Sequence, residues 1–443
     1  MAAVFAAMAA TLELAAGVVA TRPTLTLAGI GAGALVVAPE LTVLAAAVGI
    51  EEEVAPGDNP LAPVSASARF GSNLYHAQVG GLRLIVLIAV AAALISLLRR
   101  KQRIWRLAGV LIGLLIVWSF ALAMTQGSGV KGALTATVPW TVLGAGLLLG
   151  SAIRGSSSLQ QATTLCLAVL LGLKALVACY VYVRGGAMPI GDVEVVYYDS
   201  SLSLFAGSAA IAALLCRKRG FVGYSFLLSG GVLIALSMRR NVVLSLLFVV
   251  LLLIAMHSSR TAVIRTVGGL AAAILVLWVA VPHVTTAAER SLAAGMTALT
   301  SGSGDSSTVG HVQDLHSGYS LVRSSPVLGV GAYSAARDSF VVASSSNLYI
   351  HDEYLQTWAR FGLPAALLLV ILLGAAAVRA IRLLRRPATT LLTLTAGVFV
   401  VATPVALIFF PHVSTLTRFD LLIGVAIGLL STNSSPKTEG PTP

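Results

Sequence analysis

The feature that most constrains this chain is a series of long apolar runs with few charged residues. No water is available in the bilayer core, so a crossing segment must satisfy its backbone hydrogen bonds internally, and long apolar runs do so as helices. Hydrophobic residues make up 57% of the sequence and charged residues only 10%, which excludes an ordinary soluble domain. The runs lie at 3–20, 24–50, 81–98, 104–124, 133–153, 162–183, 200–216, 221–238, 241–257, 262–282, 363–382, 388–410 and 417–430.

These runs predict an all-α integral membrane protein, a polytopic bundle of about 12–13 transmembrane helices with one large extracytoplasmic loop. The count is open by one because Pro39 and Glu40 interrupt 24–50, which is either one kinked span or a shallow hairpin. The three cysteines lie in or at the end of apolar runs, as expected of small packed residues: Cys166, Cys179 and Cys216.

Charge is distributed unequally between alternate loops. One set is basic and contains no acidic residue, and the opposite set holds most of the 17 acidic residues. The positive-inside rule places the basic loops in the cytoplasm, so we expect a multi-pass protein of the cytoplasmic (inner) membrane. The net charge of +12 then reflects topology and does not indicate nucleic-acid binding. The basic loops contain Arg99, Arg100, Lys101, Arg103, Arg106, Arg154, Arg217, Lys218, Arg219, Arg260, Arg265, Arg379, Arg382, Arg385 and Arg386.

The spacing of the runs predicts four regions: N-terminal transmembrane helices (1–282), a large extracytoplasmic loop (283–362), C-terminal transmembrane helices (363–430) and a disordered cytoplasmic tail (431–443). A loop of this length in a compact protein is usually functional or disordered. Within it, helical spacing is expected over 311–325, followed by a turn, Pro326-Val-Leu-Gly-Val-Gly331. We expect short helices of this loop to cap the active site.

Polar and titratable residues gather in 343–364, at the edge of an apolar run. We predict a short helix that opens at His351, lies at the membrane surface and leads past Gly362 and Pro364 into the next span. Such a helix would place Tyr354 on the same face as His351. The stretch is either a site that holds an imidazole at the lipid boundary or an ordinary interfacial anchor with aromatic residues at headgroup level.

Three short patterns together resemble the O-antigen ligase and O-antigen polymerase superfamily. They are the stretch from His351 through Tyr-Leu-Gln to Gly-Leu-Pro, the upstream Pro-x-Leu-Gly-Val-Gly turn, and the arginines in Ser237-Met-Arg-Arg-Asn241. The resemblance covers about 200–430. It implies a GT-C-like, metal-independent glycosyltransferase without a cofactor. Its expected partners are a polyprenyl-pyrophosphate-linked glycan donor such as undecaprenyl pyrophosphate, a glycan or lipid acceptor, and membrane lipids, and no nucleic acid.

The resemblance also implies a role in cell-envelope biogenesis, in O-antigen or exopolysaccharide assembly. The family usually has Arg near the start of the loop helix, whereas this chain has Ser307-Thr-Val-Gly-His311, which is similar to a variant of exopolysaccharide polymerases. Asp352 stands where Asn is common. Both departures leave the choice between ligase and polymerase open.

Candidate site residues follow from these patterns. Arg239 and Arg240 are expected to bind the pyrophosphate through bidentate bonds, although they could simply snorkel at two helix ends. His351 is the expected catalytic base, because imidazole titrates near neutral pH, and its alternative is a structural hydrogen bond. His311 is a second catalytic candidate or an exposed loop histidine.

Three further residues complete the expected substrate-binding set: Arg323, Tyr354 and Lys174. Lys174 lies in mid-span, where a charge is costly and usually faces a cavity or a partner. It could meet Glu13, Glu40 or the lipid phosphate, or snorkel to the surface. A transporter or flippase of lipid-linked sugars is the rival interpretation, but paired halves with matching broken helices are not evident in the sequence.

Overall fold

The computed structural model of the chain describes residues 78–79, 82–83, 105–183, 188–190, 193–195, 200–216, 220–237, 240–256, 268, 306–331, 350–385, 390–409 and 417–431. The expected spans at 3–20 and 24–50, and almost all of those at 81–98 and 262–282, lie outside these residues. So do Glu13 and Glu40, the expected partners of Lys174.

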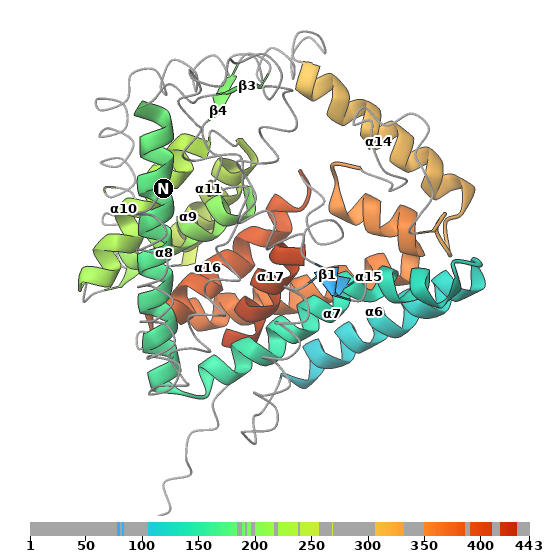
Figure 1. Ribbon diagram of the computed structural model, residues 1–443, viewed down its shortest axis with the longest axis horizontal. Helices are drawn as coiled ribbons and strands as arrows, with labels where there is room; N and C mark the ends of the chain where they lie inside the picture. Colours follow the sequence, from blue (N-terminus) through green and yellow to red (C-terminus); the bar gives the residue numbers. More distant parts are fainter. Residues whose placement is uncertain are drawn as a thin grey trace, which may run out of the picture.

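Helices make up nearly all of the described structure (Figure 1). Nine of them coincide, within a few residues except at the start of α15, with apolar runs of the sequence. The remaining helix, α14, lies in the large loop. The helices are α6 (Arg106–Thr125), α7 (Gly129–Arg154), α8 (Ser157–Val183), α9 (Ser200–Leu215), α10 (Phe221–Ser237), α11 (Arg240–Met256), α14 (Ser306–Ser324), α15 (Glu353–Leu384), α16 (Leu391–Ala406) and α17 (Thr417–Leu429).

The prediction of a polytopic α-helical membrane protein is confirmed. Within the described residues, α6, α7, α8 and α15 are long and apolar enough to cross a membrane, and the other apolar helices are shorter. Leucine and valine side chains point outward from α6, where Leu107, Val110, Leu114 and Val117 are exposed. A contiguous apolar surface of this kind is expected where lipid replaces water as the solvent.

Two small hairpins were not expected from the sequence. β1 (Gln78–Val79) pairs antiparallel with β2 (Leu82–Arg83), and β3 (Met188–Ile190) pairs antiparallel with β4 (Val193–Val195). The second hairpin lies in the predicted loop between α8 and α9. Strands this short give little periodic signal, so the apolar runs could not reveal them.

The helices α7 and α17 touch backbone to backbone. A Cβ built on Gly150 would lie 2.1 Å from the carbonyl oxygen of Val425, and one on Gly424 would lie 2.2 Å from that of Leu143. Small residues are what allow membrane helices to approach this closely. The pair therefore forms a rigid support for the helices around it.

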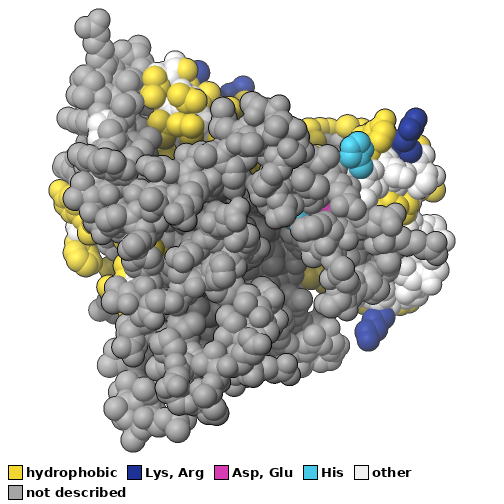
Figure 2. Space-filling view, turned by 90° about the horizontal axis from the view of Figure 1, so that it is seen from above, with side chains coloured by type: hydrophobic (Ala, Val, Ile, Leu, Met, Phe, Trp, Pro, Cys, Tyr) yellow, Lys and Arg dark blue, Asp and Glu magenta, His cyan; other side chains and the backbone are white. Residues whose placement is uncertain are grey.

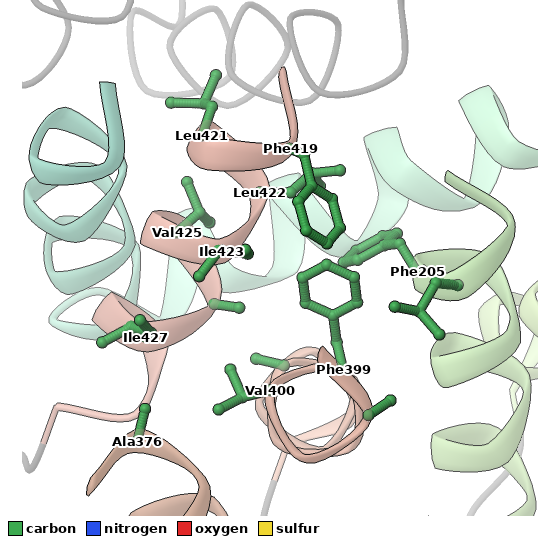
Figure 3. Close-up of a cluster of buried hydrophobic side chains, with 14 of the residues drawn as sticks. Phe205, Ala376, Phe399, Val400, Phe419, Leu421, Leu422, Ile423, Val425 and Ile427 are labelled. Atoms are coloured by element: carbon green, nitrogen blue, oxygen red, sulfur yellow. The ribbon is translucent and has the colours of Figure 1, made fainter. Parts of the chain in front are cut away.

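Aromatic side chains fill the neighbouring core. Phe399 of α16 lies edge to face with Phe205 of α9, with ring centroids 5.5 Å apart, and with Phe419 of α17, at 5.9 Å (Figure 3). This arrangement is preferred for aromatic pairs because the ring edge and face carry opposite partial charges. It packs the middle of α16 against the first turn of α17.

The three cysteines are half-buried, in keeping with small packed residues. α14 lies across the start of α15, near the ends of α6 and α7 (Figure 1). The predicted loop helix and the predicted span after it therefore come together in space, and their contact forms the candidate site.

Candidate functional site

The helix after His351 begins later than the sequence indicated. α15 starts at Glu353, and the side chain of Asp352 caps it by accepting a hydrogen bond from the backbone nitrogen of Leu355 at 2.7 Å. His351 therefore precedes the helix and does not share its face with Tyr354. The cap explains the difference, because an N-cap residue has extended backbone and ends the helical pattern.

A kink divides α15 into a short first part and a long apolar second part. Gly362 has φ 79° and ψ 174°, outside the helical region, while the residues on both sides are helical. Only glycine adopts this backbone conformation without a steric penalty. The expected break near Gly362 and Pro364 is thus present, as a kink within one helix.

The Pro326–Gly331 turn is joined to this kink by backbone hydrogen bonds, an arrangement we call the glycine clasp. The nitrogen of Val330 donates to the carbonyl of Ala359 at 2.7 Å, and that of Leu363 donates to the carbonyl of Val327 at 3.2 Å. The carbonyls at the kink, which have lost their helical partners, are satisfied by the turn. The clasp therefore holds the loop after α14 against the start of the span.

Two indoles reinforce the same region. Trp118 of α6 donates through Nε1 to the carbonyl of Phe361 at 2.7 Å, and Trp358 donates to the carbonyl of Pro326 at 2.7 Å. Each tryptophan combines a large apolar ring, which packs against other side chains, with one N–H donor, which satisfies a backbone carbonyl. The start of α15 is thereby fixed to both α6 and the loop.

His351 lies directly against Asp314 of α14. Its Nδ1 is hydrogen-bonded to Oδ2 of Asp314, with 21% of the imidazole exposed and the aspartate side chain fully buried. An ionised carboxylate only accepts hydrogen bonds, so Nδ1 is the donor, and in the neutral imidazole Nε2 then carries the lone pair. This leaves the imidazole oriented to accept a proton at Nε2.

Asp314 was not among the site residues expected from the sequence. Its signal was available, because Asp314 falls on the same face of α14 as Gly318 and Val322, and that face is otherwise small or apolar. Gly318 lets α14 approach closely: a Cβ there would lie 2.7 Å from Cδ2 of Leu355. An acidic residue on a packed helical face requires a partner, and that partner is His351.

The backbone on either side of His351 is also fixed. Ile350 donates to the side-chain oxygen of Gln356 at 2.6 Å, and the nitrogen of Glu353 donates to the carbonyl of Leu407 at 2.9 Å. Tyr354, half-buried, donates through its hydroxyl to the carbonyl of Pro404 at 2.9 Å. Tyr354 therefore binds the first turn of α15 to the end of α16.

Two buried acidic residues lie at the starts of α15 and α17. Glu353 is fully buried and accepts a hydrogen bond from Oγ1 of Thr357 at 2.9 Å. Asp420, in the first turn of α17, is also fully buried and interacts electrostatically with Glu353. Within the described residues, neither carboxyl oxygen of Asp420 has a hydrogen-bond partner.

The other expected site residues are less fully placed. Arg239 lies outside the described residues, and Arg240 opens α11 with its side chain undescribed. His311 lies on α14 one turn before Asp314, again with its side chain undescribed. Lys174 is half-buried on α8. Arg323 is exposed, with its guanidinium 5.5 Å from the ring centre of Tyr319.

Comparison with known proteins gives one family. Residues 223–370 match the O-antigen ligase family, which confirms the resemblance seen in the sequence over this part of the chain. The matched region includes α10, α11, α14, the glycine clasp and the first part of α15, and so contains both His351 and Asp314. No curated protein matches the chain. The match supports a membrane protein with a glycan ligase-like or polymerase-like role.

Proposed function

We propose that this protein is a glycosyltransferase that ligates or polymerises a glycan carried on a polyprenyl pyrophosphate such as undecaprenyl pyrophosphate. The reaction takes place at the outer face of the cytoplasmic membrane, with residues 283–362 extracytoplasmic. The observation that carries the proposal is the contact between His351 and Asp314 inside the region that matches the O-antigen ligase family. A general base held by a buried carboxylate suits transfer to a hydroxyl acceptor.

The proposed reaction begins with the acceptor hydroxyl. His351 Nε2 takes its proton, and the acceptor oxygen forms a bond to the anomeric carbon of the donor glycan. The bond between that carbon and the pyrophosphate oxygen breaks, and polyprenyl pyrophosphate leaves with the electron pair. Asp314 stabilises the imidazolium that results, because its carboxylate is hydrogen-bonded to Nδ1 of His351.

Negative charge develops on the leaving pyrophosphate and needs fixed cations. Arg240 and Arg239 are our candidates, because α11 begins at Arg240 within the matched region. The planar guanidinium makes two parallel hydrogen bonds to a phosphate, and a helix N-terminus also favours an anion. Among the described residues, Arg323 and Lys174 are the alternative candidates for binding the lipid phosphate.

The reaction as proposed follows a GT-C-like scheme in which protein side chains supply the base and the cations. Whether the acceptor is a lipid-anchored glycan, as for a ligase, or a growing chain, as for a polymerase, depends on its binding surface. The exopolysaccharide-like sequence around His311 favours neither outcome over the other.

The test is glycan transfer by the purified full-length protein in lipid nanodiscs, with polyprenyl-pyrophosphate-linked glycan as donor. His351→Ala should lower the rate by about 10²–10⁴-fold, the usual contribution of a general base, while donor binding remains. His316→Ala is a matched control, because His316 is exposed on the same helix as Asp314. His311→Ala tests the second candidate histidine.

Three results would contradict this assignment. Parental transfer by His351→Ala would place the base elsewhere, with His311 next. Joint loss of binding and transfer would make His351 a structural or donor-contacting residue. Absence of any transfer by the parental protein without a transmembrane gradient, together with movement of the lipid-linked sugar across the bilayer, would favour a transporter or flippase.

For the arginines, Arg→Lys keeps the charge but removes the planar fork. Arg240→Lys and Arg239→Lys should therefore lower transfer at the position that contacts pyrophosphate, with weaker donor binding. Full activity of Arg239→Ala and Arg240→Ala, separately and combined, would exclude both.

A further inference from the structure

The described side chains of the loop helix α14, from Asp314 to Ser324, form a packed side and an exposed surface. The packed side contains Asp314, Gly318 and Val322. Residues three and four apart lie on one face of a helix, so these three form a single stripe toward α15. Leu321 and Ser317 are partly buried, and the other described side chains from Leu315 to Ser324 outside the stripe are exposed.

The exposed surface of α14 is divided into an apolar edge and a polar edge. Leu315, Tyr319 and Arg323 follow one another at intervals of four, with Leu315 43% and Tyr319 57% exposed. Because Arg323 lies over the ring of Tyr319, the two form one surface. The polar edge consists of His316, Ser320 and Ser324.

Exposed apolar side chains follow the apolar edge along the chain as far as the long apolar part of α15. After α14, Val327 and Leu328 in the glycine clasp are 56% and 52% exposed. Val327 accepts a hydrogen bond from Leu363, the residue at which the long apolar part of α15 begins. Leu367, Val370 and Ile371, one and two turns further along α15, are exposed on that helix. From above, hydrophobic side chains lie beside a histidine and a basic side chain at the right of the molecule (Figure 2).

We propose that α14 lies on the bilayer surface, with Leu315, Tyr319, Arg323, Val327 and Leu328 as its lipid contact. We call these five residues the α14 lipid edge. The occupant is the headgroup layer of the surrounding membrane, because the edge is continuous with the apolar surface of α15. Tyrosine is enriched at the headgroup level, and arginine there reaches the phosphates while its stem stays in apolar surroundings. The polar edge faces water.

This position has a consequence for the depth of the site. Asp314 is adjacent to Leu315 on the helix and contacts His351, so a helix held at the headgroups holds the imidazole within a few ångströms of the same level. The inference concerns where the helix lies and stands apart from the proposed reaction. It holds whichever group the site transfers.

Spin labels on single cysteines test the proposal in the full-length protein. Cys166, Cys179 and Cys216 are replaced by alanine, and the protein is placed in nanodiscs of phosphatidylethanolamine and phosphatidylglycerol. Leu315→Cys, Tyr319→Cys and Leu328→Cys report on the lipid edge, with Ser320→Cys and Ser324→Cys as matched controls on the same helix. All five positions are exposed, so the labels leave the packed side intact.

The measurement is the accessibility of each label to oxygen relative to a water-soluble nickel chelate. Oxygen concentrates in lipid and the chelate in water, so the ratio should be several-fold higher on the lipid edge than on the controls. Equal ratios on both edges would overturn the proposal, since both edges would then face the same medium. Labels shielded from both agents would overturn it too, because a protein surface or a second copy would then cover the edge.

Discussion

Gly329 and Gly362 lie with their backbones in direct contact, and neither tolerates a side chain. A Cβ on Gly329 would lie 2.7 Å from the nitrogen of Gly362, and one on Gly362 would lie 2.1 Å from the carbonyl oxygen of Val327. Both residues also have positive φ, of 70° and 79°. The glycines of the turn and of the Gly-Leu-Pro stretch are thus two halves of one contact, the glycine clasp.

The clasp gives the first prediction. Gly329→Ala and Gly362→Ala should each destabilise the protein by about 1–3 kcal/mol, from strain at positive φ together with the displaced backbone. Thermal unfolding in detergent measures the change. Gly374→Ala on α15 is the matched control, because a Cβ there meets nothing within 4 Å. Equal melting temperatures for Gly329→Ala and the control would show that the turn does not rest on the kink.

The second prediction concerns the partner of His351. Asp314→Asn removes the negative charge and lets the amide donate to Nδ1, which favours the tautomer with hydrogen on Nε2. Glycan transfer should fall by about 10²–10⁴-fold, mainly in kcat, since the donor cations are unchanged. The double variant Asp314→Asn/His351→Ala should be no slower than His351→Ala. Additive losses in a double-mutant cycle would mean that the two residues act separately.

Asp352 provides a prediction on pH. Burial raises the pKa of its carboxyl, an effect that backbone hydrogen bonds from Leu355 and Tyr354 only partly offset. The folded state therefore favours the protonated acid. The stability that protonation of Asp352 contributes is complete below the ordinary aspartate pKa of 3.8. It is lost as pH rises through the raised pKa of the folded state.

Asp352→Asn cannot ionise, so it avoids the loss of stability at higher pH, and asparagine is also a good N-cap. At neutral pH the variant should melt at the parental temperature or above it, and its advantage should shrink in acid. Asp352→Ala, which lacks the cap, should cost about 1 kcal/mol at neutral pH. A melting temperature for Asp352→Asn below the parental value at neutral pH would indicate that the charge itself is needed, for example by a cationic neighbour.

Periodicity and composition predicted the membrane-spanning helices well. A helix that crosses lipid satisfies its own backbone and is apolar outside, so the apolar runs coincide with α6 to α11 and α16 to α17. The loop helix was also visible, because Leu315, Tyr319 and Val322 recur at helical spacing. For these helices, the local pattern of apolar residues is enough to predict the structure.

The site was only partly predictable, since it depends on contacts between distant segments. His351 stood out as an imidazole beside an apolar run, but its partner Asp314 is 37 positions away and belongs to another helix. The start of α15 was misplaced because helical spacing through His351 looked regular, whereas the Asp352 cap sets the boundary. Asp420 gave no sequence signal of its meeting with Glu353, which depends on how α15 and α17 pack.

The last prediction concerns Asp420 and Glu353. Both side chains are fully buried, and within the described residues the carboxyl of Asp420 makes no hydrogen bond. Two neighbouring buried carboxyls repel when charged, and an unpaired buried charge is costly. Asp420→Asn removes the ionisable group at nearly constant shape, and its amide can donate to Glu353. The variant should therefore be at least as stable as the parental protein in thermal unfolding.

Thr357→Val is the comparison for this experiment, because it removes the donor to Glu353 and leaves the shape unchanged. It should lower the free energy of unfolding by about 1–3 kcal/mol, the usual cost of leaving a buried acceptor unsatisfied. If Asp420→Asn instead destabilises the protein as much as Thr357→Val does, the carboxylate of Asp420 is required in its charged form. It would then hold α17 through a cationic partner, and the repulsion argument for this pair would fail.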